Sequence, residues 1–540
     1  MAAAKQTELR RYLVPIDTAS TQQLFTDCLV IGSGIAGLRA AIEASECCNV
    51  TLVCKGKLQD SNTWDAQGGI ASVLKSEDSL DSHVSDTLNV GCGLCNEKVV
   101  RQVVTEGPKL IKELCEWGTE FDRDGGNIAT TLEGGHSHPR VAHVHGDSTG
   151  RGIAEALLKK VQGSATINII EDFYAIDLLT NDENECVGVI GNRQPGGFAI
   201  IWATNTILAT GGTGRLYRET TNPSVATGDG LAMAYRAGVE LVDLEFIQFH
   251  PTTLYIAGAS RALITEALRG EGAKLADINK EYFMNEYHEL AELAPRDVVS
   301  RAILDRMLKT GSTHVYLDIR HFDLDKFSKR FPLINELCES FDIDVSNDMI
   351  PVRPSAHYMV GGVKVDVDGR TNIRNLFACG EVSCTGLHGA NRLGSNSLLE
   401  GVVYGKLTGA YAGESSACNI DHLRYKKMKF PVEVSDRSRL DTGDVLSSLR
   451  ALMWRNIGII RQEPRLSEAQ EIITFWQRYV MDKVFDTPAG WECQNMLIVA
   501  QLMGQAAQKR QESRGVHFRS DYPETNDAEY SKHFSIKRNG

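Results

Sequence analysis

The sequence predicts an α/β fold: a Rossmann-like dinucleotide-binding domain, an α+β capping domain inserted into it, and a C-terminal helical bundle. Three observations predict this fold. An apolar run of strand type leads directly into a glycine-rich turn at residues 32–37. Further apolar, glycine-containing runs follow at 203–217 and 371–382, so the sheet is expected to be interrupted and then resumed. The last part of the chain carries amphipathic helical patterns.

The glycine-rich turn, GSGIAG, joins a predicted strand at 27–31 to helix-forming residues and then to a second predicted strand at 49–55. This order is typical of a dinucleotide-binding βαβ unit. Gly32 would make the tight turn, Gly34 would let the backbone approach a pyrophosphate, and Gly37 would let helix and strand pack closely. The helix N-terminus would then present N–H groups to the phosphates. The residues expected to contact the dinucleotide here are Gly32, Ser33, Gly34, Ile35, Ala36 and Gly37.

The domain organisation follows from where these patterns stop and resume. Residues 244–358 show mixed helix and loop patterns, which suggests an inserted domain. We expect a first part of the dinucleotide-binding domain, a capping and substrate domain, a second part of the dinucleotide-binding domain and a helical domain, at residues 1–243, 244–358, 359–428 and 429–540. The helical domain should contain amphipathic helices at 443–460, 467–485 and 495–513.

Composition excludes several classes of function. The 540 residues carry a net charge of −13, which argues against a nucleic-acid or anionic-membrane surface, since phosphates are bound by basic patches. The 13 cysteines are scattered, as is typical of reduced intracellular thiols, and the CGLC at 92–95 is interpreted as a glycine-rich turn. Without an export signal or an apolar run of about 20 residues, a soluble, cytoplasmic protein is expected.

The number of nucleotide-binding motifs indicates the cofactor. The chain contains a single GxGxxG fingerprint. An enzyme that takes electrons from NAD(P)H commonly has a second nucleotide-binding fold, so the bound dinucleotide is expected to take its electrons from the substrate itself. This favours FAD.

Several long motifs carry a specific family resemblance. They are SNTWDAQGGIA (61–71), EFIQFHPTTLY (245–255), ITEALRGEGA (264–273), APRDVVSRAI (294–303), AHYMVGGV (356–363), GLHGANRLGSNSLLEGVVYG (386–405) and ESRGVHFRSDYPE (512–524). In this order and spacing, nearly the whole chain resembles the fumarate reductase/succinate dehydrogenase/L-aspartate oxidase flavoproteins.

The resemblance implies how FAD is held. Respiratory members of the family carry a flavin-linking histidine where this chain has Asn62, and an amide cannot form that bond, so FAD should be non-covalent. Lys55 ends the second strand, where nucleotide-binding folds usually offer an acidic group to the ribose, but lysine fits this family. The further cofactor-binding residues implied are Lys55, Asn62, Thr63, Ala66, Gln67, Gly68, Gly69, Asp229, Glu381, Ser397 and Leu398.

The resemblance also implies a dicarboxylate pocket, for which arginine is the best bidentate donor. The matching carboxylate-binding positions are His250, Thr265, His357 and Arg392. Arg296 matches the residue that carries the substrate proton, and Glu266 and Arg269, which share one helix face at i, i+3, match its relay to solvent. Taken singly, each of these residues is better explained as a structural turn residue or ion pair, but their occurrence together in the order of the family reverses that interpretation.

The stretch LEGGHSHPR (132–140) distinguishes members of the family. L-aspartate oxidases have an acidic residue before this glycine pair, as here at Glu133, and a substrate with an ammonium group needs such an anion. The alternative is a solvated acid in a glycine loop. A metal site at His136 and His138 is not expected, because no further ligand set lies near them in the sequence.

The activity implied is that of an FAD-dependent oxidoreductase acting on a CH–NH2 donor. A hydride would pass from C2 of L-aspartate to FAD, releasing iminoaspartate, and oxygen or fumarate would reoxidise the flavin. Fumarate or succinate would bind the same pocket. This is the first step of NAD biosynthesis through quinolinate, which implies a quinolinate synthase downstream. The alternative is a fumarate reductase or succinate dehydrogenase flavoprotein subunit, against which Asn62 and Glu133 argue.

Overall fold

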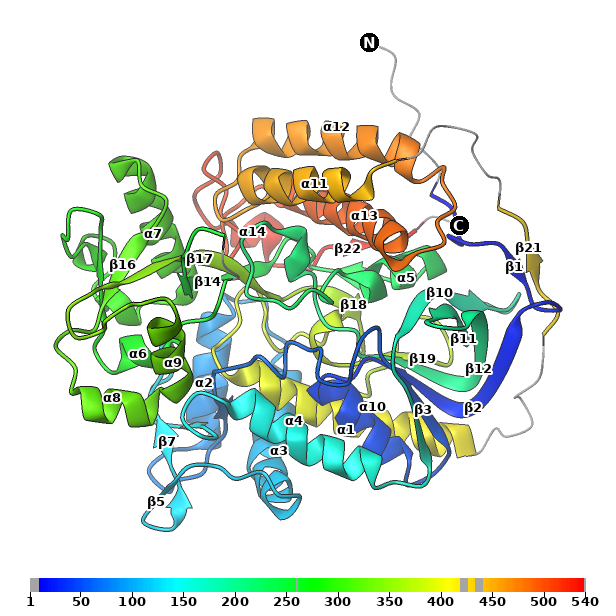
Figure 1. Ribbon diagram of the computed structural model, residues 1–540, viewed down its shortest axis with the longest axis horizontal. Helices are drawn as coiled ribbons and strands as arrows, with labels where there is room; N and C mark the ends of the chain where they lie inside the picture. Colours follow the sequence, from blue (N-terminus) through cyan, green and yellow to red (C-terminus); the bar gives the residue numbers. More distant parts are fainter. Residues whose placement is uncertain (1–8, 259–260, 418–425, 433–439, 539–540) are drawn as a thin grey trace.

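The computed structural model describes residues 9–258, 261–417, 426–432 and 440–538. Its main sheet lies in the blue and teal part of Figure 1 and has the strand order β10-β11-β12-β2-β3-β9, with β19 paired to β12. Strands β12, β2, β3 and β9 run parallel, and β10 and β11 add an antiparallel edge. The strand bounds are Gln22–Ile31 (β2), Val50–Val53 (β3), Ile167–Ile170 (β9), Phe173–Thr180 (β10), Cys186–Arg193 (β11), Gly197–Leu208 (β12) and Leu376–Ala378 (β19).

The predicted βαβ unit is present as β2, α1 (Ile35–Ala44) and β3. Gly32 adopts φ +119°, and a Cβ there would lie 2.1 Å from the carbonyl oxygen of Ala209. A Cβ on Gly37 would lie 1.9 Å from the carbonyl oxygen of Gly32. Only glycine therefore lets β2, the turn and α1 approach each other this closely. Strand β2 begins five residues before the predicted strand, because its exposed first half lacks the continuous apolar run.

Helix α1 packs against the long helix α10 (Asn396–Ala417), drawn in blue and yellow in Figure 1. The contact face of α10 carries a glycine at every fourth position. A Cβ added to any of them would lie 2.4–2.8 Å from an atom of α1. These residues are Gly401, Gly405, Gly409 and Gly413. Because side chains four apart share a helix face, the two backbones touch along this whole line.

The inserted segment builds a second sheet, in the order β14-β17-β16-β15 and fully antiparallel, at the green end of the molecule in Figure 1. Its strands are Ile247–Leu254 (β14), Lys274–Ala276 (β15), Val315–Asp318 (β16) and Ile350–Met359 (β17). Its helices are Ala267–Gly270 (α6), Arg296–Thr310 (α7), Leu324–Arg330 (α8) and Pro332–Ser340 (α9). The prediction of mixed helix and loop for this segment did not include the sheet. Strand β14 is buried throughout, yet its polar residues interrupt the apolar pattern that would indicate a strand.

The C-terminal helices are Thr442–Asn456 (α11), Glu463–Val480 (α12) and Pro488–Lys509 (α13), at the top of Figure 1. All three begin before the predicted stretches. Helix α13 is buried on nearly every side, because it packs against α11, α12 and α5 (Asp229–Ala237). The domain boundaries at 243, 358 and 428 stay a prediction. Among the residues described here, no helix is long and apolar enough to span a membrane.

Smaller elements complete the fold. The remaining helices are Leu80–Val90 (α2), Glu97–Glu116 (α3), Thr149–Gln162 (α4) and Asp527–Tyr530 (α14). The remaining strands are Ile16–Asp17 (β1), Ile70–Ala71 (β4), Arg123–Asp124 (β5), Asn127–Ile128 (β6), Thr130–Thr131 (β7), Val141–Ala142 (β8), Leu241–Val242 (β13), Gly362–Lys364 (β18), Ser383–Cys384 (β20), Lys429–Phe430 (β21) and Ser535–Ile536 (β22).

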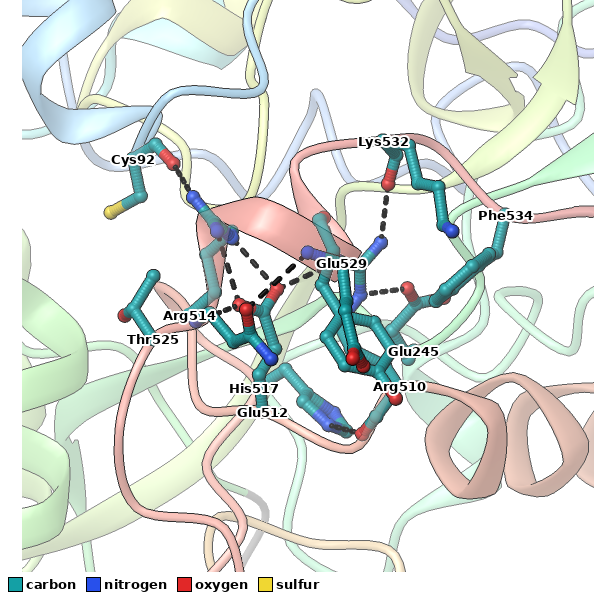
Figure 2. Close-up of polar contacts among 12 residues, drawn as sticks. Cys92, Glu245, Arg510, Glu512, Arg514, His517, Thr525, Glu529, Lys532 and Phe534 are labelled. Carbon is teal, nitrogen blue, oxygen red and sulfur yellow. Dashed lines mark hydrogen bonds and ion pairs between the residues drawn. The ribbon is translucent and has the colours of Figure 1, made fainter.

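A buried ionic network fastens the segment after α13 to the rest of the chain (Figure 2). Arg510 donates to Glu245 at 2.6 Å and to Glu512 at 2.9 Å, and Arg514 donates to Glu512 at 2.8 Å. Arg514 also donates to the carbonyl oxygen of Cys92 at 2.8 Å. Arg510, Glu245 and Glu512 are fully buried, so neither carboxylate has water to replace the arginine. The network therefore depends on Arg510.

Arg510→Met should destabilise the protein by about 3–5 kcal/mol, because it leaves the buried Glu245 carboxylate without its cation, whereas Glu512 keeps Arg514. Chemical denaturation of the purified variant measures this loss. Arg101→Met is the matched control: Arg101 forms an exposed ion pair with Glu97 and should change stability little. Equal stability of both variants would mean that packing, and not the ionic network, holds the C-terminal segment.

Candidate active site

A cavity of about 1060 Å³ lies where α1, the end of β3 and the start of α10 meet. Most of the predicted cofactor residues line it. These are Gly32, Ser33, Gly34, Ile35, Ala36, Lys55, Asn62, Thr63, Ala66, Gln67, Asp229, Glu381, Ser397 and Leu398. Gly37, Gly68 and Gly69 do not line it. Gly37 serves the packing of α1, and a Cβ on Gly69 would lie 2.3 Å from Val141, so chain packing explains both of these glycines.

Several residues of the cavity wall have polar atoms that a ligand could bind. Five buried side-chain atoms of lining residues have no hydrogen-bond partner among the described residues. They are Asn62 Oδ1, Gln67 Oε1, Thr210 Oγ1, Arg215 Nε and Asn222 Oδ1. Unpaired buried polar groups are costly. At one end, Gly34 begins α1 without a side-chain cap of its own, and Thr63 accepts a hydrogen bond from the backbone N–H of Ile35 at 3.0 Å. Gly34, Ile35 and Thr63 all line the cavity, so this helix N-terminus lies where a pyrophosphate would bind. A polar dinucleotide such as FAD fits this wall.

The acidic group missing after β3 is supplied from elsewhere in the chain. Lys55 Nζ donates to Asp229 at 2.8 Å and pairs with Glu492 at 2.6 Å. Burial works to raise the pKa of Asp229, but the Lys55 ammonium and its hydrogen bond lower it overall. Glu492 lies on α13, where the sequence shows only helical periodicity and gives no sign of this contact. Glu492 does not itself line the cavity, but it holds Lys55, which does.

Asn62 is held in one orientation. Its amide donates to Glu381 at 2.8 Å, and the other oxygen of Glu381 accepts a hydrogen bond from the backbone N–H of Met359 at 2.9 Å. Burial raises the pKa of the Glu381 carboxyl. The Asn62 amide therefore faces the cavity as a fixed polar group without a nucleophilic nitrogen.

Two arginines meet through a buried amide beside the cavity, which Arg392 lines and Arg296 does not. Gln248 Oε1 accepts a hydrogen bond from Arg296 at 3.1 Å and from Arg392 at 3.2 Å. Its Nε2 donates to Asn391 Oδ1 at 2.9 Å and to the carbonyl oxygen of Arg392 at 2.8 Å, so its orientation is determined. Gln248 was missed as a site residue, although it lies in the EFIQFHPTTLY motif. A neutral amide joins the two cations without neutralising either.

Glu266 links Arg296 to Arg269. Arg296 Nε donates to Glu266 Oε2 at 2.6 Å, and Arg269 donates to Glu266 Oε1 at 2.9 Å. Burial works to raise the pKa of Glu266, but the two guanidinium groups lower it overall. Arg269 also donates to the carbonyl oxygen of Glu292 at 2.6 Å, so a polar chain runs from Arg296 toward a half-buried segment. The three residues predicted as a relay are in contact.

The two histidines predicted to bind carboxylates lie together, with ring centroids 5.2 Å apart. Burial, then the neighbouring guanidinium groups, lower the pKa of both His250 and His357 well below the usual range, so both rings are neutral. His357 and Arg392 line the cavity. Thr265 is buried directly before Glu266 and, like His250, does not line the cavity itself.

Glu133 is buried, with 3% of its surface exposed, and is therefore not a solvated acid. Ser395 donates to its Oε2 at 3.1 Å, and His143 Nε2 lies 3.4 Å from its Oε1. Burial works to raise the pKa of Glu133, but the contact with His143 and the charges of His136 and Arg296 lower it to about 2. A buried anion thus lies beside the arginine cluster.

The glycine pair after Glu133 has a steric reason. A Cβ on Gly134 would lie 2.6 Å from Glu266 Oε1, and Gly135 adopts φ +82°.

The two histidines after the glycine pair contact protein groups. His136 Nε2 donates to the carbonyl oxygen of Gly394 at 3.0 Å, and His138 contacts the surface residues Ser82 and Ser137. No cluster of potential metal ligands occurs among the described residues.

Comparisons with known proteins agree with this arrangement. Residues 27–398 match the model of the FAD binding domain, and residues 447–540 match the fumarate reductase flavoprotein C-terminal model. The chain is 40% identical to the L-aspartate oxidase of Streptomyces coelicolor, over 95% of this chain and 91% of that protein. It is 41% identical to the L-aspartate oxidase of Vibrio cholerae, over 92% and 96%. The chain belongs to the L-aspartate oxidases of the fumarate reductase/succinate dehydrogenase flavoprotein family.

Solved structures place this L-aspartate oxidase family member in the same fold. A point mutant of E. coli quinol fumarate reductase superposes with a TM-score of 0.87 at 31% identity, covering 96% of each chain. A quinol-fumarate reductase with menaquinol gives a TM-score of 0.87 at 32% identity, covering 95% of each chain. The predicted family, the α/β fold with its helical C-terminal domain, and FAD as cofactor are confirmed. The roles of the individual site residues stay predictions.

Gln248→Leu should lower kcat/KM for the substrate tenfold or more while FAD remains bound. The substitution leaves two buried guanidinium N–H groups unpaired, and a hydrogen bond to a charged group is worth about 1.5–3 kcal/mol. Steady-state kinetics and the flavin-to-protein absorbance ratio measure the two effects. Gln511→Leu, at an exposed position, is the control. An active Gln248→Leu protein would show that the two arginines keep their positions without this amide.

Proposed function

We propose that this protein oxidises L-aspartate to iminoaspartate with non-covalently bound FAD. The observation that carries the proposal is the buried Glu133 carboxylate, which lies near a cluster of arginines and whose Oε1 is 3.4 Å from His143 Nε2. The arginines suit the two carboxylates of the substrate, and the Glu133 carboxylate suits its ammonium group. Relatives of 40–41% identity that are named L-aspartate oxidases support the same substrate.

Each residue has a proposed part in holding the substrate. Arg392, with the neutral His357 and His250, binds the carboxylates, and Thr265 contributes a hydroxyl. Glu133 binds the ammonium group. FAD, when bound, accepts the hydride that leaves C2. Arg296, fixed by Gln248 and Glu266, exchanges protons with the substrate carbon, and Arg269 continues the route toward solvent.

The product implies a further reaction step. Because iminoaspartate hydrolyses in water, we propose that an enzyme of the quinolinate synthase type consumes it, as a later step of NAD biosynthesis. Oxygen or fumarate is the proposed oxidant of the reduced flavin, and fumarate fits the same dicarboxylate pocket. A cytoplasmic location agrees with the lack of a membrane-spanning helix in the described part of the chain.

The second candidate is a fumarate reductase or succinate dehydrogenase flavoprotein subunit, which the TM-scores of 0.87 favour. Two features weigh against it. Asn62 stands at the position of the flavin-linking histidine of the respiratory enzymes, and Glu133 would repel a second negative charge in its vicinity. Succinate, which lacks an ammonium group, gives Glu133 no partner.

Acid precipitation of the purified protein should leave a yellow supernatant and a colourless pellet. The reason is that Asn62 has no nucleophilic ring nitrogen to bond the flavin, although it faces the cavity. Flavin absorbance in the two fractions measures the outcome. Flavin that stays with the pellet after washing would show a covalent link elsewhere in the chain.

Glu133→Gln should separate two activities of one site. It removes the anion and nearly keeps the shape, so kcat/KM for L-aspartate should fall by roughly two to four orders of magnitude, since breaking a buried ion pair costs about 3–5 kcal/mol. Fumarate has no ammonium group, so the rate of its reduction by the variant should be unchanged or higher.

The wild-type protein tests the proposed function first. Anaerobic bleaching of the flavin is recorded after addition of L-aspartate and, separately, of succinate.

Two outcomes of that series contradict the proposal. Bleaching by succinate and not by L-aspartate in the wild type would favour the respiratory flavoprotein. A parallel fall of both activities in Glu133→Gln would make Glu133 a structural residue. The control is Glu120→Gln, at an exposed position in the same part of the chain.

A further inference from the structure

Glu133 has a buried histidine as its neighbour. His143 follows β8 directly, and 3% of its surface is exposed. Its Nε2 lies 3.4 Å from Glu133 Oε1 and 2.9 Å from Thr131 Oγ1. Its Nδ1 has no hydrogen-bond partner among the described residues. The motifs that predicted the substrate-binding residues did not include His143.

Binding and oxidation of an amino acid require opposite protonation states of its nitrogen, which would lie beside Glu133. An anion beside the substrate nitrogen stabilises the ammonium form, which has no free electron pair. Loss of hydride from C2 requires that pair, because it becomes the second bond of the C=N group. A carboxylate, whose ordinary pKa is about 4, is too weak a base to keep a proton at neutral pH. A further group must therefore hold the proton.

We propose that His143 accepts the ammonium proton of the substrate, by way of the Glu133 carboxylate. This inference rests on the proposed oxidation of L-aspartate. One N–H bond of the ammonium group breaks, its proton passes to His143, and its electron pair stays on nitrogen. The C2–H bond then breaks, its pair leaves as hydride to the flavin, and the nitrogen pair forms C=N. Imidazole is the side chain suited to such transfer near neutral pH.

The other charged groups near Glu133 are less suited to this role. His136 is engaged through Nε2 with the Gly394 carbonyl and lies beside Arg140 through Nδ1. Arg296 is paired with Glu266, which is an anion between two guanidinium groups. The route from Arg296 serves the substrate carbon, whereas the pair Glu133 and His143 serves the substrate nitrogen. Two separate proton routes therefore meet at one pocket.

The test compares His143→Gln with His138→Gln, a half-exposed histidine of the same segment that contacts Ser82, Ser137 and Asp78. His143→Gln should lower the rate of anaerobic flavin reduction by L-aspartate more than 100-fold at pH 7. Its fumarate reduction and its affinity for succinate, measured by flavin absorbance, should stay within threefold of wild type. Its rate with L-aspartate should continue to rise above about pH 8, because the amine must then lose its proton without help.

A second variant separates chemistry from structure. In His143→Ala, added imidazole should restore oxidation of L-aspartate and leave fumarate reduction unchanged. Wild-type rates with L-aspartate in His143→Gln, or absence of rescue in His143→Ala, would overturn the proposal. A joint loss of succinate binding and fumarate reduction would make His143 structural. If wild-type protein is not reduced by L-aspartate at all, the proposed function itself fails, whatever the variants do.

Discussion

The contact between α1 and α10 is the constraint on which the site depends. The four glycines of α10 bring its backbone against α1, and larger side chains would separate the helices. Both helices begin at the cavity, α1 at the pyrophosphate end and α10 beside Ser397 and Leu398. The loop that leads into α10 carries Arg392 and Ser395. The close contact of the two backbones therefore fixes the start of α1 relative to the start of α10.

The proposed substrate site joins two arginines through a neutral amide and pairs one of them, Arg296, with the anion Glu266. Arg296 and Arg392 share the neutral Gln248, while His250 and His357 are kept uncharged by burial and by the arginines. The anion Glu266 is placed behind Arg296 and is itself held between two arginines. Such an arrangement is preorganised, because the groups need not move when a dianion enters.

The sequence predicted the parts of this protein whose physical reasons are local. The βαβ unit follows from glycine spacing and apolar runs, and Glu266 and Arg269 follow from helical spacing. The partners that come from distant segments were missed. Glu492 reaches Lys55 from another domain, Gln248 lies inside a buried strand that looks irregular, and His143 depends on the pairing of β7 with β8. Local patterns do not contain these contacts, because only the folded chain brings the segments together.

The Lys55, Asp229 and Glu492 cluster bears on the order in which the protein is assembled. The glycine turn that faces the cofactor is among the first segments to leave the ribosome, but Glu492 lies on α13, near the end of the chain. Domains generally fold in the order of synthesis. The ion-pair cluster around Lys55, however, is complete only after translation of almost all 540 residues. Chains that end before α13 would leave the Lys55 ammonium with one carboxylate fewer.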